Sequence, residues 1–259
     1  MQPLVSIVTI NKNDQHGLSK TIASIRGQAC NLEDLELIII DGNSNDGSQQ
    51  VVRQNKDIVS VFVSESDSGI YDAMNKGIAR SSGSFILFLN SGDFLFSEFN
   101  LIDSLARAKH KGYDILHLRT MQRFGKDVYI RPGLKSFLGE KSRLMPKYGH
   151  QGVFVSRRIY SSTYYKVDIG YHADMVWLSE CRDQCDDKDM YYSKSICSVH
   201  VLGGVSNTPK LWTAARYWPT IRKHGVLKYA FKVLLRALLG DRLMYRILYY
   251  AKYDHVRIR

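Results

Sequence analysis

The chain has 259 residues, of which 44% are apolar and 24% are charged, and its formal net charge is +11. This length and composition are typical of one large folded domain with at most a short extension, and they exclude a largely disordered chain. The charge is uneven, because residues 211–259 hold 11 Lys and Arg against 2 Asp and Glu, which leaves residues 1–210 with a net charge of +2. A nearly neutral body with a basic end argues against a protein that is basic throughout.

The first hundred residues alternate between strand and helix patterns. Apolar runs rich in β-branched residues predict strands at residues 4–10, 35–40, 59–63 and 85–89. Helical spacing of apolar residues predicts helices around Leu18–Ile25, at 48–55 and at 70–82. This alternation predicts βαβ units and a mainly parallel α/β sheet with helices on both faces.

After residue 100 the patterns are weaker. They predict helices at residues 101–108 and 173–182, and short strands at 115–118, 128–130 and 152–155. The apolar run at 4–10 is too short for a signal peptide, and no stretch reaches the roughly 20 apolar residues of a membrane-spanning helix. Four scattered cysteines predict a reducing cytoplasm. A zinc site formed by Cys181, Cys185, Cys197 and His200 is a weak alternative to buried thiols.

Polar side chains follow each of the first four predicted strands. They are Thr9 and Asn11, then Asp41, then segment 65–69, then segment 90–93. Ligands of open α/β sheets bind at the carboxyl ends of the strands, so the four together predict a binding edge, although turn chemistry would explain any one alone. Gly-rich phosphate-binding motifs are absent from the sequence. We therefore expect a divalent cation between Asp93 and a phosphate.

Three of these segments carry a family resemblance. They are VSIVTINKN (5–13), IIIDGNSNDGS (38–48) and SESDSGIYDAMNKGIARSSGSFILFLNSGD (64–93). They resemble the nucleotide-sugar domain of family 2 glycosyltransferases with the GT-A fold, and are most similar to bacterial enzymes that build exopolysaccharide, colanic-acid-like and O-antigen repeat units. The resemblance is dense over residues 4–96 and looser to about 207. It implies a GT-A domain at 1–210, with a donor half at 1–100 and an acceptor half at 101–210, followed by basic helices at 211–259.

The resemblance also implies a donor site. It places Thr9 and Asp41 near the nucleobase, where Asp41 would accept from a uracil N–H, and Asp67 at the ribose edge. Many relatives carry a second Asp where this chain has Gly42, which leaves base recognition with fewer groups. Lys76 is either a donor contact or a solvated surface lysine. The implied donor-binding residues are Thr9, Asn11, Asp41, Asp67, Lys76, Asn90 and Ser91.

The metal motif of the family, D-x-D-D-like, appears here as Asn90-Ser91-Gly92-Asp93. Asp93 is then the one carboxylate left to hold Mg²⁺ or Mn²⁺, while Asn90 keeps the ability to bond a ribose hydroxyl. A single carboxylate predicts weak metal binding that depends on the donor diphosphate. A metal-independent variant stays open.

Two later segments resemble the acceptor side of the family. HQGVFVSRRIY (150–160) implies acceptor contacts from His150 and Gln151. YHADMVWLSE (171–180) resembles the segment with the catalytic base, which gives that role to Asp174. An acid that stabilises the first turn of a helix is the alternative for Asp174.

The basic end combines cations with apolar and aromatic residues. Lys228, Lys232 and Arg236 recur at helical spacing beside leucines, a pattern typical of a helix in a membrane interface. A helical hairpin packed on the body and a dimer contact are alternatives, and nucleic-acid binding is not expected. We thus expect a cytoplasmic enzyme on the inner face of the plasma membrane that transfers a hexose-type sugar, with inversion, from a UDP-sugar to a polyprenyl-diphosphate-linked glycan. The alternative is a catalytically weak nucleotide-sugar or glycan-binding protein with a degenerate metal motif.

Overall fold

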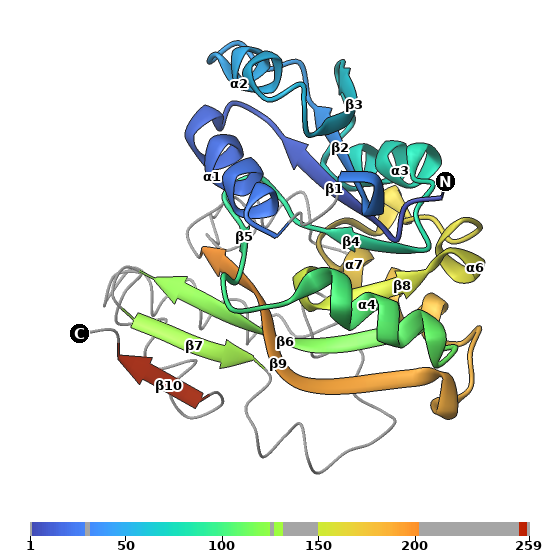
Figure 1. Ribbon diagram of the computed structural model, residues 1–259. Helices are drawn as coiled ribbons and strands as arrows, with labels where there is room; N and C mark the ends of the chain where they lie inside the picture. Colours follow the sequence, from blue (N-terminus) through green and yellow to red (C-terminus); the bar gives the residue numbers. More distant parts are fainter. Residues whose placement is uncertain (1, 29–31, 125–126, 132–149, 202–253, 258–259) are drawn as a thin grey trace, which may run out of the picture.

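The computed structural model describes residues 2–28, 32–124, 127–131, 150–201 and 254–257, and in these ranges ten strands form one mixed sheet (Figure 1). Its main path runs in the order β10-β7-β6-β8-β4-β1-β2-β3, while β9 pairs with β5 and β6. The bounds of the strands are β1 Val5–Asn11, β2 Leu35–Asp41, β3 Val59–Ser64, β4 Phe85–Phe88, β5 Phe94–Leu95, β6 Ile115–Phe124, β7 Asp127–Arg131, β8 Val153–Ser156, β9 Met190–Val201 and β10 Asp254–Arg257.

The parallel half of the sheet is confirmed. Strands β4, β1, β2 and β3 are neighbours and all pair in parallel. Their registers bring Asn11 opposite Asp41, and Asp41 opposite Ser64. The four predicted polar segments therefore meet at one edge, because the carboxyl ends of parallel strands point the same way.

Helices cover both faces of this half. The α-helices are α1 Gln15–Arg26, α2 Ser48–Gln54, α3 Ile70–Arg80, α4 Leu101–His110, α6 Arg157–Tyr160 and α7 Ala173–Arg182. Apolar residues of α1, α2 and α4 form one core with alternate strand residues such as Ile7. Residues of α3 and α7 form the other core with the intervening ones, such as Val8. Period-two alternation along buried strands thus supplies two cores.

The second half of the sheet differs more from the expectation. Strand β6 is longer than predicted. Strand β9 was not predicted at all, because the polar residues Ser193, Lys194 and Ser195, which are exposed or half-buried, interrupt its apolar pattern. Residues 254–257 lie in the segment expected to be helical, but they form a strand that pairs antiparallel with β7. These four residues therefore pack on the body as a strand and not as part of the expected helices. Residues 202–253 and 258–259 lie outside the described residues, so the domain boundary near residue 210 stays a prediction.

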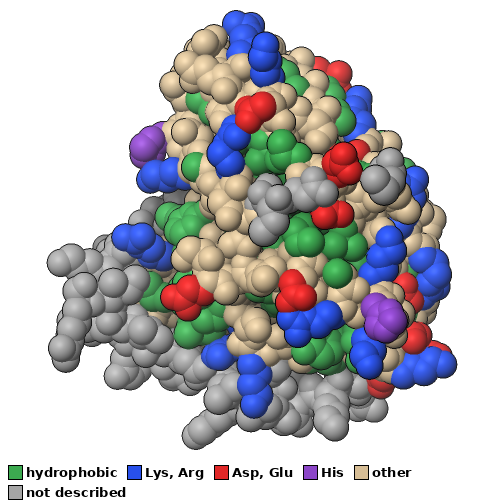
Figure 2. Space-filling model, viewed as in Figure 1, with side chains coloured by type: hydrophobic (Ala, Val, Ile, Leu, Met, Phe, Trp, Pro, Cys, Tyr) green, Lys and Arg blue, Asp and Glu red, His purple; other side chains and the backbone are tan. Residues whose placement is uncertain are grey.

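The surface of the body carries mixed charge. Figure 2 shows Lys and Arg side chains interspersed with Asp and Glu over one face, as expected from the small net charge of residues 1–210. Within the part of the chain that the structure describes, no helix is both long and apolar enough to cross a membrane.

Helix α3 packs on the sheet through a glycine, which gives a first prediction. A Cβ at Gly77 would lie 2.3 Å from Val8 Cγ1. Gly77→Ala is therefore expected to destabilise the protein by about 1–3 kcal/mol, because the core must shift to accept a methyl group. Gly27→Ala is the matched control, since Gly27 has φ −65° and a Cβ there would meet Ser24 O no closer than 3.5 Å. Urea unfolding of both variants tests this, and equal stabilities would contradict it.

Candidate functional site

The turn after β4 directs Asp93 toward another strand. The Asp93 N–H donates to the Asn90 carbonyl at 2.9 Å, and Gly92 has a φ of +90°, which favours glycine. Asp93 directly precedes β5, which pairs antiparallel with β9 so that Phe94 lies opposite Val199. This register brings His200 to Asp93 across 107 positions of the sequence.

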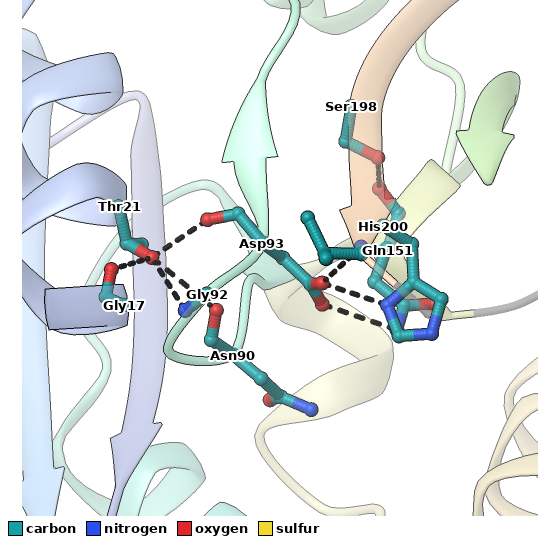
Figure 3. A network of polar contacts seen from close by, with 9 residues as sticks. Gly17, Thr21, Asn90, Gly92, Asp93, Gln151, Ser198 and His200 are labelled. Carbon is teal, nitrogen blue, oxygen red and sulfur yellow. Dashed lines mark hydrogen bonds and ion pairs between the residues drawn. The ribbon is translucent and has the colours of Figure 1, made fainter. Parts of the chain in front are cut away.

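The carboxylate of Asp93 is almost fully buried and surrounded by donors. One oxygen, Oδ1, lies 2.7 Å from His200 Nδ1 and accepts from the Val201 N–H at 3.3 Å. The other, Oδ2, accepts from Gln151 Nε2 at 3.3 Å (Figure 3). Burial of a carboxylate is unfavourable unless such partners are present. Asp93 thus links the donor half to the acceptor half.

His200 was expected only as a weak zinc candidate, and its contact with Asp93 was missed. Burial alone lowers the pKa of His200, but the Asp93 charge and hydrogen bond outweigh this and raise it above 6.5. With a proton on Nδ1, His200 donates to Asp93 and cannot accept at that nitrogen. The amide N–H of Gln151, which lies 3.3 Å from Nδ1, is therefore assigned to its bond with Asp93. The proposed zinc ligands are not assembled, because Cys181 and Cys197 lie in different cores.

The residues at Asp93 fit a divalent cation of the kind that binds nucleotides. A buried carboxylate and an imidazole nitrogen converge at 2.7 Å. The carboxylate suits Mg²⁺ or Mn²⁺ when phosphate oxygens and water complete the shell, whereas the imidazole nitrogen could join it on Mn²⁺, because nitrogen ligands suit transition metals better than Mg²⁺. His200 would have to give up its proton to take part. Among the described residues no group of three or more His, Cys, Asp and Glu is gathered around one point, so the remaining ligands would come from the substrate and solvent.

The second predicted centre, Asp174, lies in the first turn of α7. Its Oδ1 accepts from the Met175 N–H at 2.9 Å, and its Oδ2 lies 3.8 Å from His150 Nδ1. The Asp174 side chain is 25% exposed, whereas both ring nitrogens of His150 are buried without a hydrogen-bond partner. Asp174 is thus accessible to a substrate, with a polar ring behind it.

An aromatic cluster borders Asp174 and was not predicted. Tyr165 stacks on Trp177 with ring centroids 4.9 Å apart, and its buried hydroxyl has no hydrogen-bond partner. Burial and then the charge of Asp174 raise the pKa of Tyr165 well above 10.0. The Asn75 amide holds the Tyr165 backbone through two reciprocal hydrogen bonds. Buried polar groups without partners are rare in native proteins and mark a candidate functional site.

Segment 150–151 joins the two centres. It forms a 3-10 helix, His150–Gly152, directly before β8. A Cβ at Gly152 would lie 2.6 Å from the Leu118 carbonyl oxygen, so glycine permits this close approach to β6. Gln151 contacts Asp93 while its neighbour His150 contacts Asp174. The structure therefore brings together the predicted metal anchor, acceptor-side pair and base.

Asp41 lies at the same edge of the sheet but is occupied by its own chain. Its Oδ1 accepts from Asn11 Nδ2 at 2.8 Å and Ser44 Oγ at 2.5 Å, and its Oδ2 from the Ser44 N–H at 2.9 Å and Ser64 Oγ at 2.8 Å. Burial alone would raise the pKa of Asp41, but the hydrogen bonds from Ser44, Asn11 and Ser64 lower it below 3.8. Asp41 thus ties together the ends of β1, β2 and β3, and its contact with a nucleobase stays a prediction.

Asp41→Asn is expected to destabilise the protein by about 2–3 kcal/mol, because the amide group would turn a donor toward donors. The folded pKa is depressed, so the stabilisation is present above pH 3.8 and lost as the pH falls through the folded pKa. The stability difference from wild type should therefore shrink in acid. Urea unfolding at pH 7 and pH 3 tests this, with exposed Asp57→Asn as a control of small effect.

The other predicted donor-binding residues lie around this edge, and they differ in whether their side chains already have partners within the protein. A Cβ at Gly42 would lie 2.5 Å from Asp67 Oδ2, so the Asp67 carboxylate fills space that a side chain at position 42 would need. Lys76 Nζ bonds the Ser66 carbonyl at 3.0 Å and Glu65 at 2.8 Å, which holds the loop before α3. Three buried oxygens lack a hydrogen-bond partner, namely Thr9 Oγ1, Asn11 Oδ1 and Asn90 Oδ1. Ser91 Oγ bonds the Asp14 carbonyl at 3.2 Å.

Solved structures share this fold at low sequence identity. Staphylococcus aureus TarS in complex with UDP-GlcNAc superposes with a TM-score of 0.67 at 15% identity, over 80% of this chain and 60% of that chain. A Pyrobaculum calidifontis mannosyltransferase in complex with GDP-Man and Mn²⁺ gives a TM-score of 0.59 at 15% identity, over 80% of this chain and 59% of that one. The expected GT-A fold is confirmed.

Relatives by sequence agree with the fold. A PGL/p-HBAD biosynthesis glycosyltransferase of Mycobacterium bovis is 27% identical over 226 residues, which cover 80% of each chain. A Mycobacterium tuberculosis glycosyltransferase is 42% identical over 91 residues, which cover 35% of this chain and only 34% of that protein. Residues 6–167, more than half of the chain, match the family model described as Glycosyl transferase family 2. The chain therefore belongs to glycosyl transferase family 2.

Proposed function

We propose that the protein is an inverting glycosyltransferase that moves a hexose-type sugar from a UDP-sugar to a lipid-linked glycan in bacterial surface polysaccharide synthesis. Family membership supports the reaction class. The observation that carries the proposal is the convergence of Asp93, segment 150–151 and Asp174 beside the carboxyl ends of the parallel strands. A displacement needs a charged group near the leaving group and a base near the nucleophile, and Asp93 and Asp174 could supply one each.

The donor side supplies binding and charge. Asp93 would hold Mg²⁺ or Mn²⁺, with His200 as a further ligand of Mn²⁺, and the cation when bound offsets the charge that grows on the departing diphosphate. The orphaned Asn90 Oδ1 and Thr9 Oγ1 are free to accept from donor hydroxyl or base N–H groups, which would remove the cost of burying them without a partner. TarS with UDP-GlcNAc and the mannosyltransferase with GDP-Man and Mn²⁺ share the fold. The fold therefore accommodates both uracil and guanine nucleotides, and the choice of UDP is tested by a binding panel.

The acceptor side supplies the base. The acceptor hydroxyl oxygen forms a bond to the anomeric carbon from the face opposite the diphosphate, and the bond from that carbon to the diphosphate oxygen breaks. The hydroxyl proton passes to Asp174, which is accessible and has one oxygen beside His150. Attack from the opposite face inverts the anomeric configuration. The membrane contact predicted for residues 211–259, of which the structure describes only 254–257, remains part of the proposal.

A thermal-shift panel tests donor binding. UDP, GDP and CMP and their sugars are each added with Mn²⁺, Mg²⁺ or chelator. We expect the Tm to rise most with one UDP-sugar and Mn²⁺, and the rise to disappear with chelator. A larger rise with GDP-sugars would replace UDP in the proposal. Binding without measurable sugar transfer would favour the alternative of a nucleotide-sugar-binding protein.

A further inference from the structure

Helix α1 places a buried hydroxyl beneath the turn that carries Asp93. Thr21 is completely buried, and its neighbours on the helix, Leu18 and Ile22, belong to the apolar core. The Thr21 side chain instead faces the turn 90–93 (Figure 3). A hydroxyl buried at such a position is unfavourable unless it is hydrogen-bonded, so its partners show what it does.

The Thr21 hydroxyl forms hydrogen bonds with the main chain of two consecutive residues of the turn, Gly92 and Asp93. Its Oγ1 donates to the Asp93 carbonyl oxygen at 2.6 Å and accepts from the Gly92 N–H at 3.1 Å. The Gly17 and Asn90 carbonyl oxygens lie at 3.1 and 3.4 Å. A hydroxyl has one proton, which we assign to the shortest contact. One side chain thereby satisfies two polar groups of the turn.

The turn needs such a clamp because its own backbone is permissive. Gly92 has a φ of +90° and no side chain to restrict it. Apart from Thr21, the turn is held by its internal Asp93-to-Asn90 hydrogen bond, by the Ser91 N–H, which donates to the Ile10 carbonyl at 3.0 Å, and by the Ser91 hydroxyl, which bonds the Asp14 carbonyl at 3.2 Å. Both bonds of Ser91 act two residues before Asp93. Thr21 therefore supplies the contact that fixes the Asp93 backbone itself to α1.

The contacts of the Asp93 carboxylate depend on the position of its backbone. The carboxylate oxygens reach His200 on β9 at 2.7 Å and Gln151 in the 3-10 helix before β8 at 3.3 Å. A shift of the turn by a few tenths of an ångström would break the 3.3 Å contact with Gln151 and lengthen the one with His200. We propose that Thr21 is a positioning residue that sets the affinity of the site for a metal–nucleotide pair by fixing Asp93. This inference rests on the proposed function, because it takes Asp93 as the carboxylate on the diphosphate side.

The test compares Thr21→Val and Thr21→Ser by isothermal titration with UDP in the presence of Mn²⁺. Valine removes the hydroxyl at nearly constant shape, and we expect an affinity about ten-fold weaker, the usual lower effect of losing a group that orients a metal ligand. Serine keeps the hydroxyl and should bind within about two-fold of wild type, given its small loss of packing. In transfer assays, the Mn²⁺ concentration for half-maximal rate should rise by a similar factor in Thr21→Val, while kcat at saturating Mn²⁺ changes little.

Thr163→Val is the matched control. Its buried hydroxyl donates to the Ile159 carbonyl at 2.8 Å and accepts from Gln184 Nε2 at 2.8 Å, so the same two kinds of bond are lost away from the turn. We expect a lower Tm and unchanged UDP–Mn²⁺ affinity. Unchanged affinity in Thr21→Val, or ten-fold weaker binding in Thr21→Ser, would overturn the role of Thr21 and leave the proposed function intact. Failure of the wild-type protein to bind any nucleotide would overturn both.

Discussion

Asp174→Asn is expected to lower kcat by about a thousand-fold and to leave donor affinity within about two-fold, because a general base contributes roughly 10² to 10⁴ to the rate. The amide has the shape of the carboxylate but cannot take the acceptor proton. Among the described residues, the one short hydrogen bond that Asp174 accepts comes from Met175 in the next position, at 2.9 Å, so Asn should keep the local structure. The measurement is the rate of UDP release under saturating donor, together with donor affinity from titration.

Asp103→Asn is the control for the alternative role of Asp174 as a first-turn acid. Asp103 lies in the first turn of α4, in an ion pair with Arg107, and should affect stability slightly and turnover not at all. If Asp174→Asn behaves in the same way, Asp174 is only a helix-stabilising acid. Parallel losses of donor affinity and turnover would also contradict its role as base.

Asp93→Asn is expected to weaken UDP binding in Mn²⁺ about a hundred-fold and to make binding insensitive to chelator, because the cation loses its charged protein ligand. The variant should also lose about 1–3 kcal/mol of stability, since an amide N–H₂ would face the donors of His200, Gln151 and Val201. Titrations of UDP with Mn²⁺ and with chelator give the first quantity, and urea unfolding gives the second.

Asp114→Asn separates these two effects. Asp114 is also a largely buried carboxylate, bonded by Ser156 at 2.5 Å and paired with Arg158, but it contacts none of the candidate site residues in these interactions. The Asp114→Asn variant should be less stable than wild type but should keep the metal-dependent binding of UDP. If wild-type UDP binding never depends on metal, the Asp93–His200 pair is a structural ion pair, and the metal-independent variant that the sequence left open is correct.

Local sequence pattern predicted the parallel half of the sheet well. The runs at 4–10 and 35–40 are apolar except for Ser6, Thr9 and Glu36, which is typical of strands buried on both faces, and the structure buries almost all of their residues. Strand β9 was not predicted because Ser193, Lys194 and Ser195, which are exposed or half-buried in the structure, interrupt its apolar pattern. Residues 254–257 form a strand because β7 offers them an open edge, which is a tertiary cause that no local pattern records.

The candidate site also contains residues that the sequence predicted and residues that only the tertiary structure brings together. Turn chemistry and family motifs pointed to Asp93, Gln151 and Asp174, whose polar character stands out from apolar surroundings. His200 could not be found in this way, since it meets Asp93 only through the β5–β9 register. Thr21 is hidden in an ordinary helical pattern. The hydrogen bonds to Asp41 show a structural role where the family resemblance implies a nucleobase contact, because side-chain competition for one carboxylate appears only when β1, β2 and β3 are assembled.

The stereochemistry of donor hydrolysis tests the central claim most directly and needs no knowledge of the acceptor. The protein is incubated with Mn²⁺ and the α-linked UDP-sugar that raises its Tm most, and the released sugar is followed by proton NMR before its anomers equilibrate. Water replaces the acceptor at Asp174, so the account predicts that the β-anomer appears first and that Asp174→Asn suppresses its release. First appearance of the α-anomer, or an equal rate in Asp174→Asn, would contradict inverting transfer with Asp174 as the base.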